Sequence, residues 1–247
     1  MDKKILITGT GIISAMGRNT REVEMNLYKG KCGLHHDEDR WDYISDLCGK
    51  VPSWKEDYLS ILTHAQYKCM PAHGFYALDA VFEALKKAKV SKEFLENHNV
   101  SLIVSNDSEC YESVDLVKHV KSDADNRQLP VTTLFNTLNS AISMNLATIL
   151  GIHGLSLTVS AACAGGGHAI GLAKMLLDSK QTEMVIVIGA QECASRYCME
   201  AFDALGVFSP DKVQPFGKNI TRKFLPMRNT NVCLYMVSMH LMRYLKH

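Results

Sequence analysis

The sequence predicts an α/β fold in which a mostly parallel sheet lies between layers of helices. Short apolar runs of strand type alternate with longer segments of helical periodicity along most of the 247 residues. Several of the runs are continuously apolar, which is typical of parallel strands that are covered on both faces. Hydrophobic residues make up 47% of the chain and charged residues 21%, the balance of an ordinary globular protein with a core.

The first unit is a strand, a loop and a helix. The apolar run at residues 5–7 leads into Gly11, as a buried strand leads into a tight turn. Asn19, with Glu22 three positions later, is typical of a capping box at the start of a helix. Gly30 then predicts the end of that helix, whose apolar face contains Val23 and Leu27.

Further strands and helices alternate after residue 70. Residues 31–69 predict only loops with short helices. From Pro71 to about Lys89 we expect a helix, and its apolar stripe should face the sheet. That stripe comprises Phe75, Leu78, Phe82 and Leu85. Strands are expected at 100–104, 155–159 and 184–188, and helices at 114–117, 138–149 and 169–176, with Gly151 as a C-terminal cap.

Charge and hydropathy exclude several classes of partner. The formal net charge is +1 and the pI is near 7.6, so no overall field attracts nucleic acid. No apolar run approaches the ~20 residues that span a bilayer. The start of the chain resembles a signal peptide, but polar residues and glycines interrupt its apolar stretch. We therefore expect no nucleic-acid partner and no membrane span.

The cysteines indicate a reducing compartment. They are scattered singly, with no CxxC pair and no histidine at metal-ligand spacing. Reduced thiols in a cytoplasmic protein, without a metal site, are the simplest interpretation. The eight positions are Cys32, Cys48, Cys69, Cys110, Cys163, Cys193, Cys198 and Cys233.

The most informative segment is VSAACAGGGHAIG, residues 159–171, where a strand runs through small residues and one cysteine into a helix. Cys163 should lie at the N-terminus of that helix. There the helix dipole and unpaired N–H groups favour the thiolate, the form that acts as a nucleophile. The flanking small residues keep the approach open, as in a nucleophile elbow. The alternative, a small buried hydrophobe in a glycine-rich bend, stays open on this pattern alone.

Five segments, in order, resemble the β-ketoacyl-acyl-carrier-protein synthases, the ketosynthases of the thiolase superfamily. In that family the active-site turn has alanine and cysteine followed by small residues, glycine and histidine. The resemblance implies the N-terminal βαβαβ half of a thiolase-like fold. The five segments are ILITGTGIIS (5–14), GLSLTVSAAC (154–163), VIVIGAQECAS (185–195), FDALGVFS (202–209) and QPFGKN (214–219).

The resemblance also implies an activity. Cys163 would take an acyl group from the phosphopantetheine thioester of acyl carrier protein, in fatty acid or polyketide biosynthesis, and no cofactor would be bound. Its backbone N–H would be one oxyanion donor. Phe202 is the candidate for the acyl pocket. His168, on the helix after Cys163, is interpreted as a packing residue.

Other parts of the family pattern are missing. The two later catalytic histidines and the glycine-rich oxyanion loop have no counterpart in the 247 residues. We therefore divide the chain into a ketosynthase half at 1–219 and a divergent basic tail at 220–247. Because no acidic residue follows Asp211, we interpret the tail as a frameshifted or truncated ending without an evolved fold. A basic amphipathic helix at residues 232–246 is the alternative.

Different classes of function compete with this reading. A catalytically inactive partner subunit or a gene remnant would act by association, and a homodimer or a heterodimer with an intact ketosynthase is expected in either case. A dinucleotide-binding enzyme is disfavoured because Ser14 replaces the third glycine of its fingerprint. A cysteine hydrolase would need an acid and a histidine after the nucleophile, and the acid-free tail does not supply that pair.

Overall fold

The computed structural model describes residues 5–38, 46–51, 58, 60–107, 110–122, 129–130, 132–191, 196–205 and 236–244. Its main sheet has five strands in the order β1-β7-β6-β4-β5. Strand β4 is parallel to both β5 and β6, whereas β7 is antiparallel to its neighbours β1 and β6. The sheet strands are β1 (Ile5–Ile13), β4 (Val100–Ser105), β5 (Ser156–Val159), β6 (Met184–Gln191) and β7 (Met236–Tyr244).

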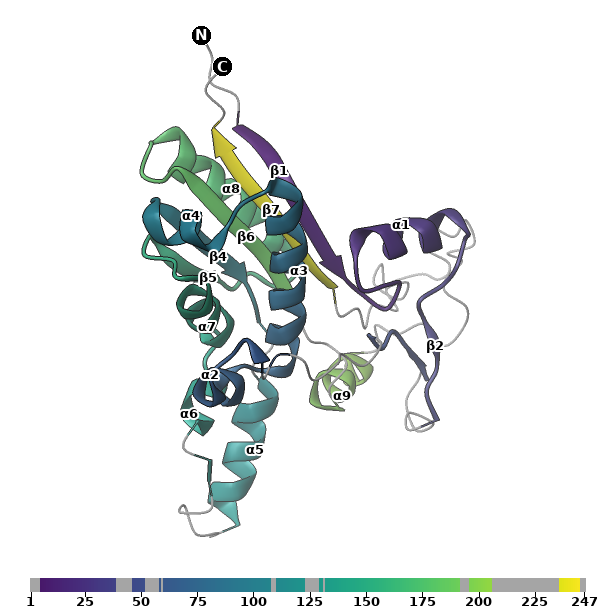
Figure 1. Ribbon diagram of the computed structural model, residues 1–247. Coiled ribbons are helices and arrows are strands. Elements are labelled where there is room, and N and C mark those ends of the chain that lie inside the picture. The colour runs from purple at the N-terminus through teal and green to yellow at the C-terminus, as the bar shows by residue number, and fades with distance from the viewer. Residues whose placement is uncertain are drawn as a thin grey trace.

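Helices cover both faces of the sheet, as the sequence predicts. In Figure 1, α3 passes in front of β1 and β7, and α8 lies behind the sheet. The larger core lies on the α3 and α7 side, and the smaller core lies beneath α8. The helices are α1 (Thr20–Tyr28), α2 (His64–Cys69), α3 (Ala72–Ala88), α4 (Lys92–Asn97), α5 (Cys110–Lys121), α6 (Thr133–Asn136), α7 (Ala141–Leu150), α8 (Gly165–Asp178) and α9 (Arg196–Ala204), with a 3₁₀ turn η4 (Ala162–Ala164) before α8.

The caps of the helices follow the sequence signals. The side chain of Asn19 accepts a hydrogen bond from the Glu22 N–H, 2.9 Å, at the start of α1. Pro71 precedes α3, and Lys89 ends that helix in the left-handed conformation with φ of 54°. Gly151 ends α7 with φ of 67°, a conformation that glycine adopts without steric cost.

Two predicted core positions are wrong. Leu27 is 62% exposed, because only one residue of α1, Val23, is buried. Phe82 is 37% exposed, whereas the other members of its stripe are buried. α3 thus presents a narrower face to the core than its apolar residues suggest.

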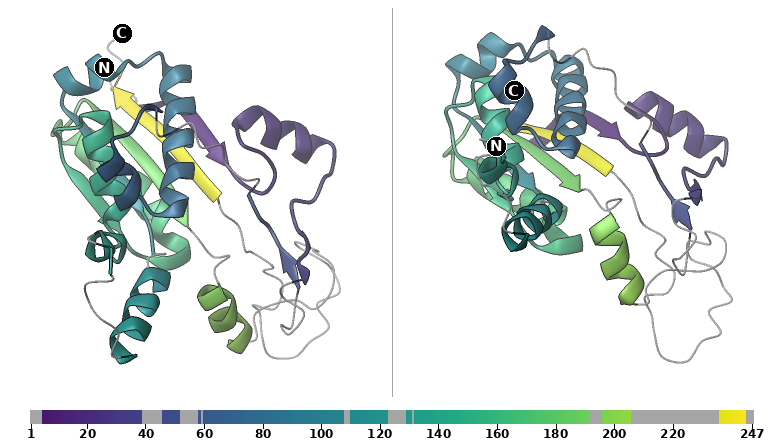
Figure 2. Two further views of the ribbon diagram at one scale, coloured as in Figure 1. Left: turned by 60° about the horizontal axis from the view of Figure 1, so that its bottom comes forward. Right: turned by 90° about the horizontal axis from the view of Figure 1, so that it is seen from below.

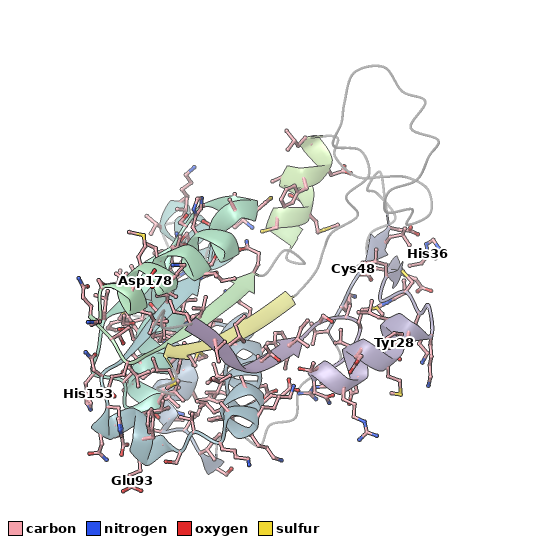
Figure 3. The ribbon with its side chains drawn as sticks, turned by 90° about the horizontal axis from the view of Figure 1, so that it is seen from above. Tyr28, His36, Cys48, Glu93, His153 and Asp178 are labelled. Carbon is pink, nitrogen blue, oxygen red and sulfur yellow. The ribbon has the colours of Figure 1, made fainter. Side chains whose placement is uncertain are left out.

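The sequence also missed a second, small sheet. Strands β2 (His35–His36) and β3 (Leu47–Cys48) pair antiparallel within the segment predicted as loops and short helices. Figure 3 shows His36 and Cys48 on the same side of the molecule as Tyr28 of α1, away from Asp178 at the end of α8. Two residues per strand are too few to give a recognisable alternation.

The tail contains a strand, β7, so the alternative of a basic helix at residues 232–246 is wrong. That the tail is a frameshifted or truncated ending remains a prediction. β7 forms backbone pairs along both edges, from Ile5↔Tyr244 to Ile13↔Val237 on β1 and from Met184↔Arg243 to Gln191↔Met236 on β6. A strand with a partner on each side is stabilised by two ladders of backbone hydrogen bonds. Such pairing cannot be recognised from the sequence when the side chains show only weak alternation. The division at residue 219 remains a prediction.

A partly buried carboxylate, that of Glu83, links β1 and α1 to α3. Glu83 Oε2 accepts from the Ile12 N–H, 3.1 Å, Glu83 Oε1 accepts from the Thr20 N–H, 2.9 Å, and Lys87 Nζ lies 2.8 Å from Oε1. Burial opposes ionisation, but these donors outweigh it and hold the pKa of Glu83 below its ordinary value. Because the folded-state pKa is lowered, this contribution to stability is present above the unfolded pKa near 4.5 and is lost as pH falls through the lower folded value.

The connection from β5 to α8 contains a strained residue. Ala162 has φ of 46°, a left-handed conformation that residues with a Cβ rarely adopt. This sharp reversal takes the chain from the end of β5 into η4.

None of the helices within the described ranges is long and apolar enough to cross a membrane.

We predict that Leu241→Pro lowers the free energy of unfolding by at least about 2 kcal/mol, because proline removes a ladder donor from a strand paired on both sides. Leu241 pairs with Gly9 and with Ile186. Leu241→Val, which keeps the donor, is the control. Urea unfolding followed by circular dichroism measures the effect, and equal midpoints for Leu241→Pro and the parent chain would refute the placement of β7.

We predict that Ala162→Gly stabilises the chain by about 0.5–1 kcal/mol, since glycine adopts a positive φ without the Cβ clash and its chain entropy offsets part of the gain. Ala161→Gly, in the same turn at φ of −155°, should destabilise. The melting temperatures of both variants, compared with that of the parent chain, test this prediction. A lower melting temperature for Ala162→Gly than for the parent chain would show that Ala162 is not strained.

Candidate active site

Cys163 lies at the carboxyl edge of the sheet. Because β4, β5 and β6 run parallel, the segments that follow them emerge at this edge, and Figure 2 shows α9 beside the end of β6. Cys163 follows β5, is exposed, and occupies the middle of η4, directly before α8 begins at Gly165. The thiol is thus both accessible and next to the positive end of a 14-residue helix.

Two backbone hydrogen bonds close the turn that contains Cys163. The Ala164 N–H donates to the Ala161 carbonyl, 3.0 Å, and the Gly165 N–H donates to the Ala162 carbonyl. Neither bond uses the Cys163 N–H, which is the donor that the sequence analysis proposed. A backbone donor beside a nucleophile can stabilise negative charge on an attacked carbonyl oxygen.

Three consecutive residues, the last of β4 and the two that follow it, lie against this turn, and we refer to Ser105, Asn106 and Asp107 as the β4 cradle. The Asn106 N–H donates to the Val159 carbonyl, 3.1 Å, and Asp107 Oδ1 accepts from the Ser160 hydroxyl. These contacts tie the end of β5 to the end of β4, immediately before the turn that carries Cys163.

Ser105 lies against the other end of the turn. A Cβ added to Gly165 would meet the Ser105 Oγ at 2.2 Å, so a larger residue at this first position of α8 would require the Ser105 side chain to move. Sequence reasoning missed the β4 cradle. The available signal was the polar pair Asn106 and Asp107 directly after a buried strand, at the edge where parallel strands place functional groups.

The outward face of α8 is open. Gly165, Ala169, Ala173 and Leu177 face the sheet at intervals of four, and a Cβ at Gly166, Gly167 or Gly171 would meet nothing within 4 Å. His168 is exposed in this chain, so its interpretation as a packing residue is wrong here. The glycines near His168 on this face provide no side chains against which its ring could pack.

Phe202, the acyl-pocket candidate, lies on α9, which follows β6. It emerges at the same carboxyl edge as Cys163, but β4 separates β5 from β6 in the sheet. Its side chain is 40% exposed. The structure therefore brings Phe202 to the correct edge without enclosing it.

A cavity of about 380 Å³ lies elsewhere, between α3, α4 and α7, and includes Phe82, Lys86, Leu95 and Ile149 in its lining. Its lining contains neither Cys163 nor Phe202. Within the described ranges, no three side chains of His, Cys, Asp or Glu gather as metal ligands. The group at the carboxyl edge that can act as a nucleophile is the exposed thiol of Cys163, in the turn before α8.

Comparisons with known proteins agree with this geometry. The model of the family described as "Beta-ketoacyl synthase, N-terminal domain" matches residues 2–219. The chain is 27% identical over 212 residues to 3-oxoacyl-(acyl-carrier-protein) synthase 1 of Buchnera aphidicola subsp. Acyrthosiphon pisum, covering 84% of this chain and 51% of that protein. The protein of the same name from Escherichia coli K12 is 28% identical over 211 residues, with the same shares covered.

Solved structures show the same fold. The ishigamide ketosynthase/chain length factor superposes with a TM-score of 0.81 at 20% identity, covering 99% of this chain and 59% of that one. A β-ketoacyl synthase from Burkholderia phymatum STM815 also gives 0.81 at 20% identity, with 99% and 60% covered. The chain spans about half the length of the curated relatives it matches. The fold is the thiolase-like fold of ketosynthases, and the chain belongs to the β-ketoacyl synthase family, through the N-terminal domain of that family.

Proposed function

We propose that this chain is the acyl-accepting part of a β-ketoacyl-acyl-carrier-protein synthase, with Cys163 as the nucleophile. The observation that carries the proposal is the exposed thiol of Cys163 in the turn directly before α8. The family membership supports it, as do relatives whose names include acyl-carrier-protein synthase activity. Nothing in the proposal requires a bound cofactor, because the acyl group arrives on the phosphopantetheine of acyl carrier protein.

The proposed step is transfer of an acyl group between two sulfur atoms. The Cys163 thiolate attacks the thioester carbonyl, and the developing oxyanion accepts a hydrogen bond from the Cys163 N–H. Collapse of the tetrahedral intermediate breaks the bond to phosphopantetheine, whose thiol leaves with a proton. The acyl group then remains on Cys163, with its chain toward the side of α9 that carries Phe202.

The later steps are proposed for the whole enzyme. Decarboxylation of a malonyl thioester and attack of the resulting carbanion on the acyl group require donors that polarise the malonyl carbonyl. We assign these donors to segments outside residues 1–219. Purified alone, the 247-residue chain should form little or no ketoacyl product.

A cytoplasmic setting fits the state of the thiols. Within the described ranges no disulfide joins Cys32, Cys48, Cys69, Cys163 or Cys198. A reducing compartment keeps such a nucleophile available.

The second candidate function is association with another polypeptide, as an inactive or incomplete partner. The open face of α8 favours it: Met175 is 66% exposed and Ile170 is 37% exposed beside glycines that leave space. A polypeptide that covers this face would bury apolar surface and exclude water from it. Homodimers and heterodimers with an intact ketosynthase both satisfy this requirement.

We predict that iodoacetamide alkylates Cys163 faster than Cys32 near neutral pH by about fivefold, the ratio that a helix N-terminus worth about 1 kcal/mol provides. Cys32 is the matched control because it is also exposed. Peptide mapping at several times gives both rates. A faster reaction at Cys32 or Cys198 would reject the nucleophile assignment.

We predict that the chain associates at micromolar concentration and that Ile170→Lys together with Met175→Lys weakens this association by about tenfold or more. Charges on the face would remain unpaired when it is covered. Tyr28→Lys, at an 85% exposed position on α1, is the control and should have no effect. Sedimentation velocity provides the measurement, and a parent chain that stays monomeric would refute the association.

A further inference from the structure

We propose that His73 and Asn106 form a positioning pair that sets the place of the Cys163 turn. The inference rests on the proposed function, because it concerns the nucleophile of that reaction. Neither residue touches the reacting atoms. Both act through the ends of the strands that carry the turn.

Asn106 is the junction of four separate segments. Its backbone N–H donates to the Val159 carbonyl at the end of β5, and its Nδ2 donates to the Asn139 carbonyl, 3.0 Å, just before α7. His73 Nε2, in the first turn of α3, lies 3.2 Å from Asn106 Oδ1. This single residue thus links four segments: its side chain contacts α3 and the approach to α7, and its backbone, directly after β4, is bonded to the end of β5.

The hydrogen bonds of Asn106 show which member of the pair donates and which accepts. Because the Asn106 amide uses Nδ2 to reach a carbonyl, its Oδ1 faces His73 as an acceptor. His73 must then carry its proton on Nε2 and donate it. This donor contributes to the orientation of the amide, and with it to the contact with Asn139.

Burial makes each member of the pair sensitive to the loss of the other. His73 is 3% exposed and Asn106 is fully buried, so if one is removed, water cannot restore the lost hydrogen bond of the other without a cost in free energy. An Asn106 amide without its donor would rotate or shift, and the exits of β4 and β5 would shift with it. Such a shift reaches Cys163, since the β4 cradle is hydrogen-bonded to Val159 and Ser160 immediately before the turn, and Ser105 lies against Gly165 after it.

The test compares two conservative variants in the full 247-residue chain. His73→Gln keeps an amide donor at the reach of Nε2, whereas His73→Asn is one methylene shorter and cannot reach Asn106. The readout is the alkylation rate of Cys163 by iodoacetamide divided by that of Cys32 in the same molecule. We expect the ratio to stay within about twofold of the parent in His73→Gln and to fall about fivefold in His73→Asn, as the thiol leaves its place at the helix terminus.

A purely structural role would lower the melting temperature of both variants and leave the ratio unchanged. Equal ratios in the two folded variants would overturn the proposal, as would a fall in His73→Gln as large as in His73→Asn. Asn106→Leu is the second probe and should lower the ratio at least as far as His73→Asn. The ratio is measured whether or not Cys163 accepts an acyl group, so failure of acylation would reject the proposed function and leave this test intact.

Discussion

Strand β4 is the constraint on which the site depends. All six of its residues are buried, and it pairs with β5 on one side and β6 on the other. Its position is therefore fixed by the core on both faces and by two ladders. Because Asn106 and Asp107, directly after it, are hydrogen-bonded to the segment that leads into the Cys163 turn, the rigidity of the strand extends to the proposed nucleophile. An exposed thiol on a loop would have no such support.

The sheet is completed by a strand from the far end of the chain. β7 separates β1 from β6, so β1 joins the main sheet only through β7. The helix α3 rests on β1 and β7, and the first turn of α3 carries His73. Strand β7 of the basic tail is thereby connected, through β1 and α3, to the pair of His73 and Asn106 beside the Cys163 turn.

Much of the fold could be predicted from the sequence because its signals are local. Asn19, Pro71 and Gly151 mark helix ends through backbone chemistry that acts within a few residues. Cys163 could be placed at a helix start for the same reason. β7 could not be predicted, since its stability comes from neighbours at least 45 residues away in sequence, the separation of the pair Gln191↔Met236. The hydrogen bond between His73 and Asn106 is likewise a contact of tertiary structure, and the sequence around neither residue predicts it.

The central claim is that residues 1–219 form an acyl-accepting site at Cys163. The most direct measurement is mass spectrometry of the whole chain after incubation with an acyl-acyl-carrier-protein thioester, followed by peptide mapping, with Cys163→Ser as the control. The account predicts that the mass rises by one acyl group, located on the peptide that contains Cys163, and that the control gains none. An unmodified Cys163 in the folded chain, or an acyl group on another cysteine, would contradict it.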